Sequence, residues 1–470
     1  MKCLVIGAGN AGRPAARILN HVGRNVTITD SKNLEEFPTS VQETLLKMKE
    51  EGVNLHLGSD TPNNMEDVDE AYISPNIPSD APIRDIIDSK DTAKLSSRQI
   101  SGIINKLMDI DVIGITGTLG KTSTTHLVAE IFNESGWDVW TCSSLHGNLL
   151  SEIIVEGIVQ GLPQDKDLAV LELPHGTSRF MSEVELKVGL LTNIYPEHLS
   201  EFEGSMERYI ERKMLITRSS QFFVTSLKCK DLVEPTRQDG FYFYYPQKER
   251  NQDCHFWGDY SEEKLKVFYQ FNGHEGNFET QFQLPGYYRQ NAVAATAVAL
   301  IYGLKGEEVK NALSNFKGID AHMEYLGNFC GREVYFDAAY LPEGMKPTLD
   351  CFKGNPLVVV IDNPDSSTPR DKYDIGQVLG RYSKVIISSG YNETMKYLDM
   401  DAAREVLRGA EGSDALKIAV EDMETATELS IKNSQKGDTI LHVGPGAVSA
   451  YHELKNNMIK GLKRGCQKYG

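Results

Sequence analysis

Short apolar runs alternate with longer stretches of helical periodicity along most of this chain. The runs at 3–6, 112–115, 188–192 and 357–361 contain almost no polar residue, and amphipathic segments such as 401–408 lie between runs of this kind. Strands that are apolar on both faces are typical of parallel sheets covered by helices on both sides. The alternation of such strands with helices therefore predicts an α/β fold.

The length of 470 residues suits about three domains, and the pattern offers two boundaries. A polar segment at 88–97 has the composition of a linker, and a predicted helix ends shortly before Gly318. We therefore expect domains at 1–109, 110–318 and 319–470. The first and the third show the alternating pattern of Rossmann-like, doubly wound units.

The second domain opens with T-G-T-L-G-K-T-S-T, residues 116–124, directly after an apolar run and before a helical pattern. Glycines allow backbone N–H groups to approach phosphate oxygens, and the helix N-terminus and a lysine add positive charge. The loop departs from the usual P-loop spacing, because Ile115 stands where a glycine is normal. We predict a nucleoside triphosphate site formed by Gly117, Thr118, Gly120, Lys121, Thr122 and Ser123, with the Thr122 hydroxyl placed to ligate Mg²⁺.

The first domain begins with a second glycine pattern, G-A-G-N-A-G at 7–12, and Asp30 follows after the next strand. Two interpretations remain open for this pattern. The loop could bind a pyrophosphate, with Asp30 on a ribose as in nicotinamide enzymes, or it could be a tight turn that only packs a helix on a strand. An NAD(P)-dependent oxidoreductase is therefore one alternative function.

Two further polar positions follow buried strands of the second domain. Glu172 ends the run V-L-E, and Glu197 and His198 follow the strand at 188–192. Strand ends of open α/β sheets face the ligand crevice, where a carboxylate suits Mg²⁺. A solvated charge or a structural histidine would explain each position taken singly.

Together these motifs resemble the Mur ligases, ATP-dependent amide-forming enzymes of cell-wall peptide synthesis. The resemblance rests on T-G-T-x-G-K-T, the strand-end Glu172, N-I-x-x-E-H ending at His198, and Lys213 fifteen residues later. In addition, V-D-E-A-Y-I-S-P-N-I-P at 68–78 is similar to the UDP-sugar-binding domain of the glutamate-adding, MurD-type member. The segment at 437–449 is similar to the last strand and loop of the third domain of the family.

The resemblance implies a three-domain architecture and an ADP-forming acid–amino-acid ligase. Such an enzyme uses ATP and two Mg²⁺ ions to add a free amino acid to a UDP-linked cell-wall precursor, of peptidoglycan or pseudomurein, through an acyl phosphate. A folylpolyglutamate-synthetase-like ligase is the related alternative. The family also implies a monomer.

The resemblance also implies roles for individual residues. Lys121, His198 and Lys213 would be catalytic. Thr122 and Glu172 would hold one Mg²⁺, and His198 with a carbamylated Lys213 would hold the second. The nucleotide would further contact Gln290, Asn291, His322 and Asp337. The substrates would contact Gly7, Gly9, Asp30, Ser74, Asn148 and Ser449.

Several positions depart from the family pattern. Leu119 stands in place of a usual Asn, Glu197 in place of Asp, and His322 in place of a common Arg. The positions expected to bind metal match the family pattern better than those expected at the periphery of the nucleotide. This distribution suggests a divergent member, such as an archaeal pseudomurein peptide ligase.

Composition narrows the choice of partners and compartment. The chain has 66 acidic and 49 basic residues, a net charge of −17, which argues against nonspecific binding to nucleic acid or anionic membranes. No uncharged apolar stretch reaches the roughly 18 residues of a membrane span. The seven cysteines are dispersed, which is typical of reduced thiols. We expect a cytoplasmic protein without disulfides.

Overall fold

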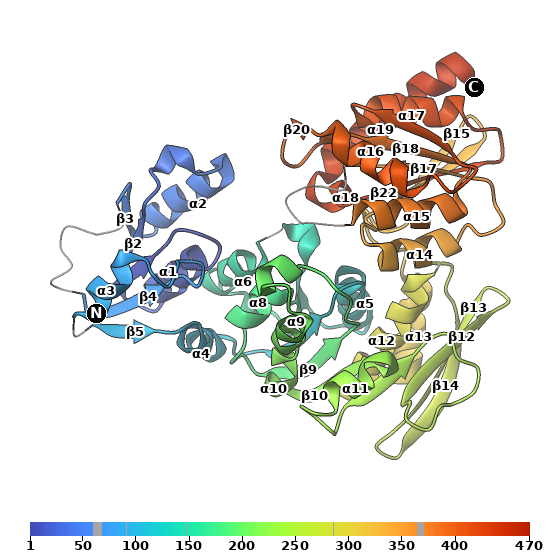
Figure 1. Cartoon of the computed structure of the whole chain (residues 1–470). Coiled ribbons are helices and arrows are strands. Elements are labelled where there is room, and N and C mark those ends of the chain that lie inside the picture. Colours follow the sequence, from blue (N-terminus) through green and yellow to red (C-terminus); the bar gives the residue numbers. More distant parts are fainter. Residues whose placement is uncertain (60–67, 91, 148, 285, 364–370) are drawn as a thin grey trace.

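The computed structural model describes residues 1–59, 68–90, 92–147, 149–284, 286–363 and 371–470. Three sheets, of five, nine and six strands, follow one another along the described chain. Figure 1 shows that each sheet belongs to a separate α/β unit, with the first unit at one end of the molecule. The predicted α/β class with three successive units is confirmed, whereas the limits at 109 and 318 stay predictions.

The first unit contains a parallel five-stranded sheet in the order β3-β2-β1-β4-β5. The strand order reverses between β1 and β4, which opens a crevice at their carboxyl ends. Its elements are β1 (Lys2–Ile6), α1 (Gly12–His21), β2 (Asn25–Asp30), α2 (Thr39–Glu50), β3 (Asn54–Leu57), β4 (Glu70–Ile73), α3 (Pro82–Asp88), β5 (Ala93–Leu95) and α4 (Ser97–Leu107).

The second unit has a nine-stranded sheet in the order β14-β13-β12-β11-β10-β9-β6-β8-β7. The pairs from β7 to β12 are parallel, and β13 and β14 add an antiparallel edge. Its strands are β6 (Asp111–Thr116), β7 (Val139–Cys142), β8 (Leu168–Glu172), β9 (Leu186–Leu191), β10 (Ser220–Ser226), β11 (Phe241–Tyr244), β12 (Phe256–Ser261), β13 (Lys264–Phe271) and β14 (His274–Gln281). Its α-helices are α5 (Lys121–Glu134), α6 (Leu150–Val159), α7 (Leu162–Asp165), α8 (His175–Phe180), α9 (Met206–Lys213), α10 (Leu215–Ser219), α11 (Lys230–Val233), α12 (Tyr287–Tyr302) and α13 (Gly306–Asn315).

The third unit has a six-stranded sheet in the order β15-β16-β22-β17-β18-β21, in which only the β15–β16 pair is antiparallel. Its strands are β15 (Glu324–Phe329), β16 (Arg332–Asp337), β17 (Leu357–Ile361), β18 (Val385–Ser389), β21 (Leu416–Val420) and β22 (Thr439–Val443), with a small hairpin of β19 (Tyr391–Asn392) and β20 (Tyr397–Leu398). Its helices are α14 (Pro342–Asp350), α15 (Lys372–Tyr382), α16 (Met400–Gly409), α17 (Met423–Lys432), α18 (Gly446–Ser449) and α19 (Tyr451–Tyr469).

Burial explains why these apolar runs form central strands. All five residues of β17, Leu-Val-Val-Val-Ile, are buried because helices cover both faces of the sheet. Each fully buried side chain of this kind stabilises the fold by about 1.5–3 kcal/mol. In the second unit, α12 is rich in buried alanine, whose small side chain allows this helix and α5 to approach closely.

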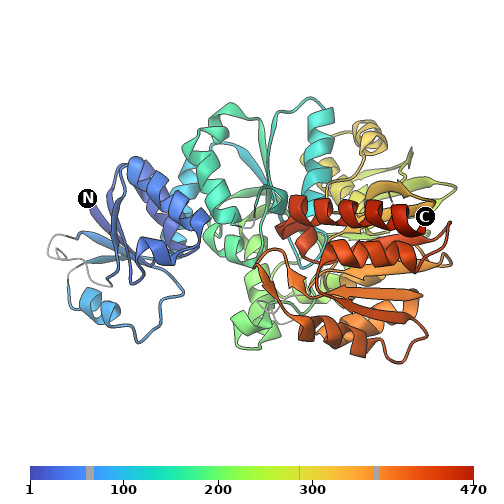
Figure 2. The ribbon, with the colours of Figure 1, turned by 90° about the horizontal axis from the view of Figure 1, so that it is seen from above.

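Ion pairs join the first unit to the second. Arg13 of α1 contacts Glu152 of α6 at 2.5 Å, and Arg17 contacts Glu156 one turn further along. The Arg13 side chain is almost fully buried, so its pairing with Glu152 offsets the cost of desolvating the guanidinium. Figure 2 shows the first unit meeting the second along this side, while the third unit lies against the opposite part of the second.

The expectation that all cysteines are reduced is wrong for two of them. Cys330 and Cys466 form a disulfide, with their Cα atoms 5.8 Å apart across 136 residues of sequence. Cys330 lies in the turn after β15, and α19 returns over that turn. Only tertiary packing brings the two together, so their sequence spacing gave no signal.

The described part of the chain contains no helix that is both long enough and apolar enough to span a bilayer.

Candidate active site

A cavity of about 610 Å³ lies between the second and third units. One wall is formed by the glycine-rich loop before α5, the segment after β7, the end of β8, the segment after β9 and the first turn of α12. The other wall comes from the segments after β16, β17, β19 and β22. The carboxyl ends of parallel strands from two sheets thus face one another, which is the usual location of ligand sites in such folds.

The loop before α5 has the shape of a phosphate cradle. Gly117 and Gly120 adopt φ angles of 141° and 77°, which favour glycine. A Cβ at Gly117 would lie 2.0 Å from the Thr192 hydroxyl oxygen, so this position also leaves no space for a side chain. The segment after β9 fixes the loop, because Leu119 N–H donates to Asn193 Oδ1 at 2.9 Å and Tyr195 N–H donates to the Thr118 hydroxyl at 3.0 Å.

Lys121 is held over this loop. Its ammonium group donates to the carbonyl oxygen of Thr118 at 2.6 Å. Ser123 lies fully buried in the first turn of α5. The loop therefore presents one fixed positive charge and the free N-terminus of a helix at the cavity, the combination that binds phosphate oxygens.

Thr122 and Glu172 meet as the sequence predicts. The Thr122 hydroxyl donates to Glu172 Oε2 at 3.0 Å, and the same oxygen accepts the N–H of Ser144 at 3.0 Å. Glu172 is buried at the end of β8, so its position is well fixed. A hydroxyl and a carboxylate at the phosphate end of the cavity are the hard oxygen donors that Mg²⁺ prefers, so these residues fit one such ion.

Lys213 lies behind the loop and is 1% exposed. Its ammonium donates to the carbonyl oxygen of Gly117 at 2.8 Å. Burial, reinforced by the nearby charge of Lys121, lowers the pKa of Lys213 to about 7, although Glu197 and Glu172 oppose the shift. A substantial fraction of this side chain is therefore a neutral, nucleophilic amine at neutral pH.

Glu197 provides the opposite charge. Burial alone would raise the pKa of Glu197, but the positive charges of Lys121 and His198 and a hydrogen bond from Tyr340 hold it below its usual value. Glu197 therefore stays ionised between the two lysines. The hydrogen bond also joins the second unit to the third, because Tyr340 follows β16.

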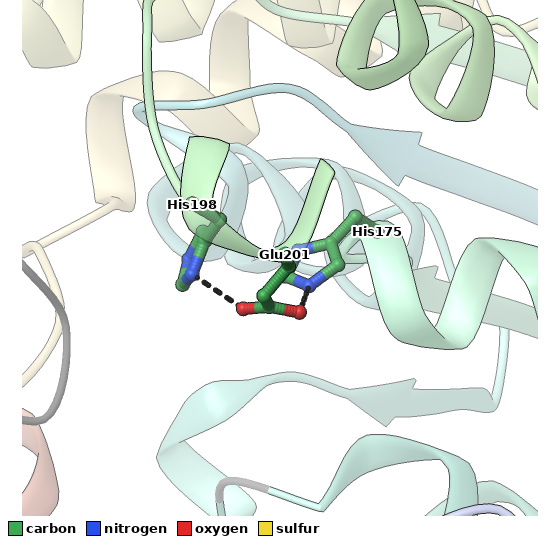
Figure 3. Close-up of side chains that lie close together, drawn as sticks. All are labelled: His175, His198 and Glu201. Carbon is green, nitrogen blue, oxygen red and sulfur yellow. Dashed lines mark hydrogen bonds and ion pairs between the residues drawn. The ribbon is translucent and has the colours of Figure 1, made fainter. Parts of the chain in front are cut away.

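His198 connects two carboxylates through its two ring nitrogens. Its Nε2 atom lies 3.5 Å from Glu197 Oε1, and its Nδ1 atom lies 3.0 Å from Glu201 Oε1. The other oxygen of Glu201 accepts a hydrogen bond from His175 Nε2 at 2.9 Å (Figure 3). Such a carboxylate commonly fixes the ring of a metal-binding histidine and leaves its other nitrogen for the cation.

Sequence reasoning missed His175 and Glu201. Burial, together with the neighbouring His198, lowers the pKa of His175 to about 4, so its imidazole is neutral and able to act as a ligand or a hydrogen-bond donor. The ligand atoms of His175, His198 and Glu201 lie within 4.8 Å of one another. Their spacing offered a weak signal, because His175 follows Glu172 by three residues and Glu201 follows His198 by three.

The residues predicted to contact the periphery of the nucleotide also line the cavity, but they differ in how free their polar atoms are to bind a ligand. Asn291 is buried against Gly120, and among the described residues its Nδ2 atom has no hydrogen-bond partner, which suits a ligand acceptor. Gln290 and His322 lie nearby on the cavity wall. Asp337 instead accepts four hydrogen bonds from within the protein, from Tyr287, Met323, Ala339 and Thr348. A ribose contact by Asp337 would require one of these to be exchanged and stays a prediction.

The predicted substrate residues divide between two places. Ser449 lies on the cavity wall, where its hydroxyl oxygen is 2.6 Å from that of Thr394. Gly7, Gly9, Asp30 and Ser74 lie at the strand ends of the first unit and do not line this cavity. Asp30 accepts hydrogen bonds from the N–H groups of Ala8 and Lys32, so both of its oxygens help to shape the loop. Asn148 lies outside the described residues.

Replacing His198 by glycine should raise the Mg²⁺ concentration needed for half-maximal activity by about 10- to 100-fold, because the cation ligand that the family resemblance implies would be lost. Glycine suits the φ angle of 53° at this position, so the backbone is not strained. The measurement is the initial rate of phosphate release across a Mg²⁺ titration. His21→Ala, at an exposed histidine of α1, is the control. An unchanged Mg²⁺ requirement in His198→Gly would remove His198 from the metal site.

Comparison with known proteins adds independent information. A family model described as the Mur ligase middle domain matches residues 115–299. An uncharacterised protein of Methanothermobacter thermautotrophicus is 42% identical over 220 residues, which are 46% of this chain and 69% of that protein. A UDP-N-acetylmuramoylalanine–D-glutamate ligase of Lactococcus lactis is 30% identical over 349 residues, which are 72% of this chain and 71% of the ligase.

The fold has a solved counterpart as well. The structure of a pseudomurein peptide ligase type C from Methanothermus fervidus aligns with a TM-score of 0.58 over 97% of this chain and 99% of the other, at 20% identity. This similarity shows the fold alone, whereas the similarity to the Lactococcus ligase is one of sequence and covers most of both chains. This chain belongs to the Mur ligase family.

Proposed function

We propose that this chain is an ATP-dependent, ADP-forming ligase that adds an amino acid to a UDP-linked cell-wall precursor. The observation that carries the proposal is the convergence of Lys121, the Thr122–Glu172 pair and the Lys213–Glu197–His198 cluster around one loop. Domains 1–109, 110–318 and 319–470 would bind the UDP-linked acceptor, ATP and the amino acid, respectively.

The reaction consists of two transfers. A carboxylate oxygen of the acceptor attacks the γ-phosphorus of ATP, the bond to the β,γ-bridging oxygen breaks, and ADP leaves. The amine of the amino acid then attacks the carbonyl carbon of the acyl phosphate and loses a proton, and phosphate leaves as the amide forms. Lys121 stabilises the charge of the transferring phosphoryl group. Mg²⁺, when bound, neutralises charge on the phosphate oxygens.

Lys213 is proposed to act after carbamylation. Its neutral amine attacks the carbon of CO₂, an N–C bond forms, and the nitrogen releases a proton. The product is an anion with carboxylate oxygens, a hard ligand for a second Mg²⁺ beside His198. The lowered pKa of Lys213 supports this step, since only the unprotonated amine reacts.

The first unit supports a UDP-linked acceptor. Nothing lies within 4 Å of where a Cβ would stand at Gly9, so a pyrophosphate could approach the exposed part of that loop. Asp30 accepts a backbone N–H at each oxygen, so its carboxylate helps to fix the loop in either interpretation. The Lactococcus relative is a ligase of UDP-N-acetylmuramoylalanine, and the Methanothermus structure is a pseudomurein ligase. Both support a cell-wall acceptor.

We further propose that the protein works as a monomer in the cytoplasm, where ATP is available.

The proposal is tested by phosphate release from ATP in the presence of Mg²⁺, UDP-linked muramyl or peptidyl acceptors, and each amino acid in turn. We expect phosphate release to require both the acceptor and one amino acid, with the amide product detected by mass spectrometry. Nucleotide binding without phosphate release that depends on an amino acid would instead indicate a regulatory nucleotide-binding module.

A further inference from the structure

We propose that the amino acid added by this chain carries a cationic side chain, and that Glu393 is the carboxylate that pairs with it. This inference rests on the proposed ligase function and specifies the substrate class of its third unit.

Glu393 is buried at an unusual place. It is the first residue of the turn between β19 and β20, yet it is 3% exposed, whereas Met395 in the same turn is 56% exposed. The Glu393 side chain lines the cavity. Among the described residues, its carboxylate has no hydrogen bond or ion pair with another side chain, only a hydrogen bond to its own backbone N–H. A buried carboxylate in this state is stabilised by a cation supplied from the cavity.

The titration of Glu393 agrees with this geometry. Burial raises the pKa of Glu393 to about 7, its own backbone N–H opposes the shift, and the negative charge of Glu453 adds to it. Lys396 lowers the pKa, and its ammonium also pairs with Glu453. Among the described residues, no basic side chain forms an ion pair with Glu393.

The turn that carries Glu393 is fixed before any ligand binds. The side-chain oxygen of Asn392 accepts the N–H groups of Thr394 and Met395 at 3.0 and 2.8 Å. The Thr394 hydroxyl meets the Ser449 hydroxyl of α18 at 2.6 Å. Glu393 is thus presented between two segments of the third unit, and little ordering is needed for it to bind a ligand.

The cavity as a whole favours a cation on this side. Of the described residues that line the cavity, only Lys121 is a lysine or an arginine, and it belongs to the phosphate loop. The third-unit wall contributes carboxylates and, among the described residues, no lysine or arginine. The acidic residues on this wall are Asp337, Glu343, Asp362 and Glu393.

The position of Glu393 indicates which end of the substrate it meets. Glu393 follows β19 on the third-unit wall of the cavity, whereas Lys121 lies on the phosphate loop of the opposite wall. The reacting amine must reach the acyl phosphate near Lys121, so Glu393 meets the far part of the amino acid. A carboxylate there would be repelled, whereas a side-chain ammonium or guanidinium would be attracted.

The test compares the binding of L-lysine and L-norleucine, which differ by the terminal ammonium, to the full-length protein saturated with Mg-ADP. We expect calorimetry to show lysine binding at least about 10-fold more tightly. Glu393→Gln should remove this preference. Glu411→Gln, at an exposed carboxylate of the third unit that does not line the cavity, should keep it. ADP affinity, measured for each variant, reports whether the fold is intact.

Two results would overturn the inference. One is equal affinity for lysine and norleucine in the unaltered protein, and the other is an equal loss of affinity for both in Glu393→Gln, which would place Glu393 at the α-amine. Amide formation separates this inference from the function itself. If the enzyme ligates alanine or glutamate efficiently but not lysine, ornithine or arginine, in either enantiomer, the cationic substrate is refuted and the ligase function is still supported. If lysine binding depends on Glu393 but no amino acid yields an amide, the pairing of Glu393 with a cation is supported and the ligase function is refuted.

Discussion

Lys121→Ala should lower amino-acid-dependent phosphate release by about 10²–10³-fold, the effect of removing one group that stabilises transition-state charge. The lysine lies on the phosphate loop at the N-terminus of α5, with its ammonium over the Thr118 carbonyl oxygen. Without it, the loop keeps its backbone N–H groups but loses its one full positive charge. The measurement is the rate of phosphate release at saturating ATP, acceptor and amino acid.

The fold should survive this change because the Lys121 side chain is not part of the core. Lys106→Ala, at an exposed lysine of α4, is the matched control and should retain the original rate. A Lys121→Ala protein with an unchanged rate would show that the phosphoryl group is transferred elsewhere.

Lys213→Ala should lower activity by about 100-fold, and millimolar acetate should restore part of the loss. The substitution removes the nitrogen that carries the proposed carbamate and leaves a space behind the loop that a small carboxylate can fill. The unaltered enzyme should also lose activity as the pH falls below about 7, since the Lys213 amine is then protonated and cannot react with CO₂. A lysine with the ordinary pKa of 10.5 would be almost wholly protonated even at neutral pH.

Acetate should not rescue Lys121→Ala, which makes that variant the control for nonspecific stimulation. If Lys213→Ala fails to fold, Lys213→Met preserves the buried volume and tests the same chemistry. Full activity of either variant without acetate would remove Lys213 from the site.

The site residues whose positions follow most directly from the sequence are those within one strand–loop–helix segment or at a strand end. Gly117, Gly120 and Lys121 are contiguous, so their geometry follows from local backbone preferences. Glu172 depends only on the rule that parallel strands end at the same edge of a sheet. The overall fold could be predicted for the same reason, since alternating strands and helices leave few possible arrangements.

Other features depend on tertiary structure and could not be read from one chain. Lys213 looks like a surface lysine in its own helix and was identified only through the family resemblance. Glu201 looks like a solvated acid, although it holds two histidines. Glu393 lies in a turn where exposure is the usual expectation, yet the folded third unit buries it. The bonds that saturate Asp337 come from four separate segments.

The link between Cys330 and Cys466 closes a covalent ring around nearly all of the third unit, from the end of β15 to the last turns of α19. A closed ring restricts the unfolded chain, so the oxidised protein should resist heat and denaturant better than the reduced one. The redox balance of its surroundings would therefore set how firmly the third-unit wall of the cavity keeps its shape.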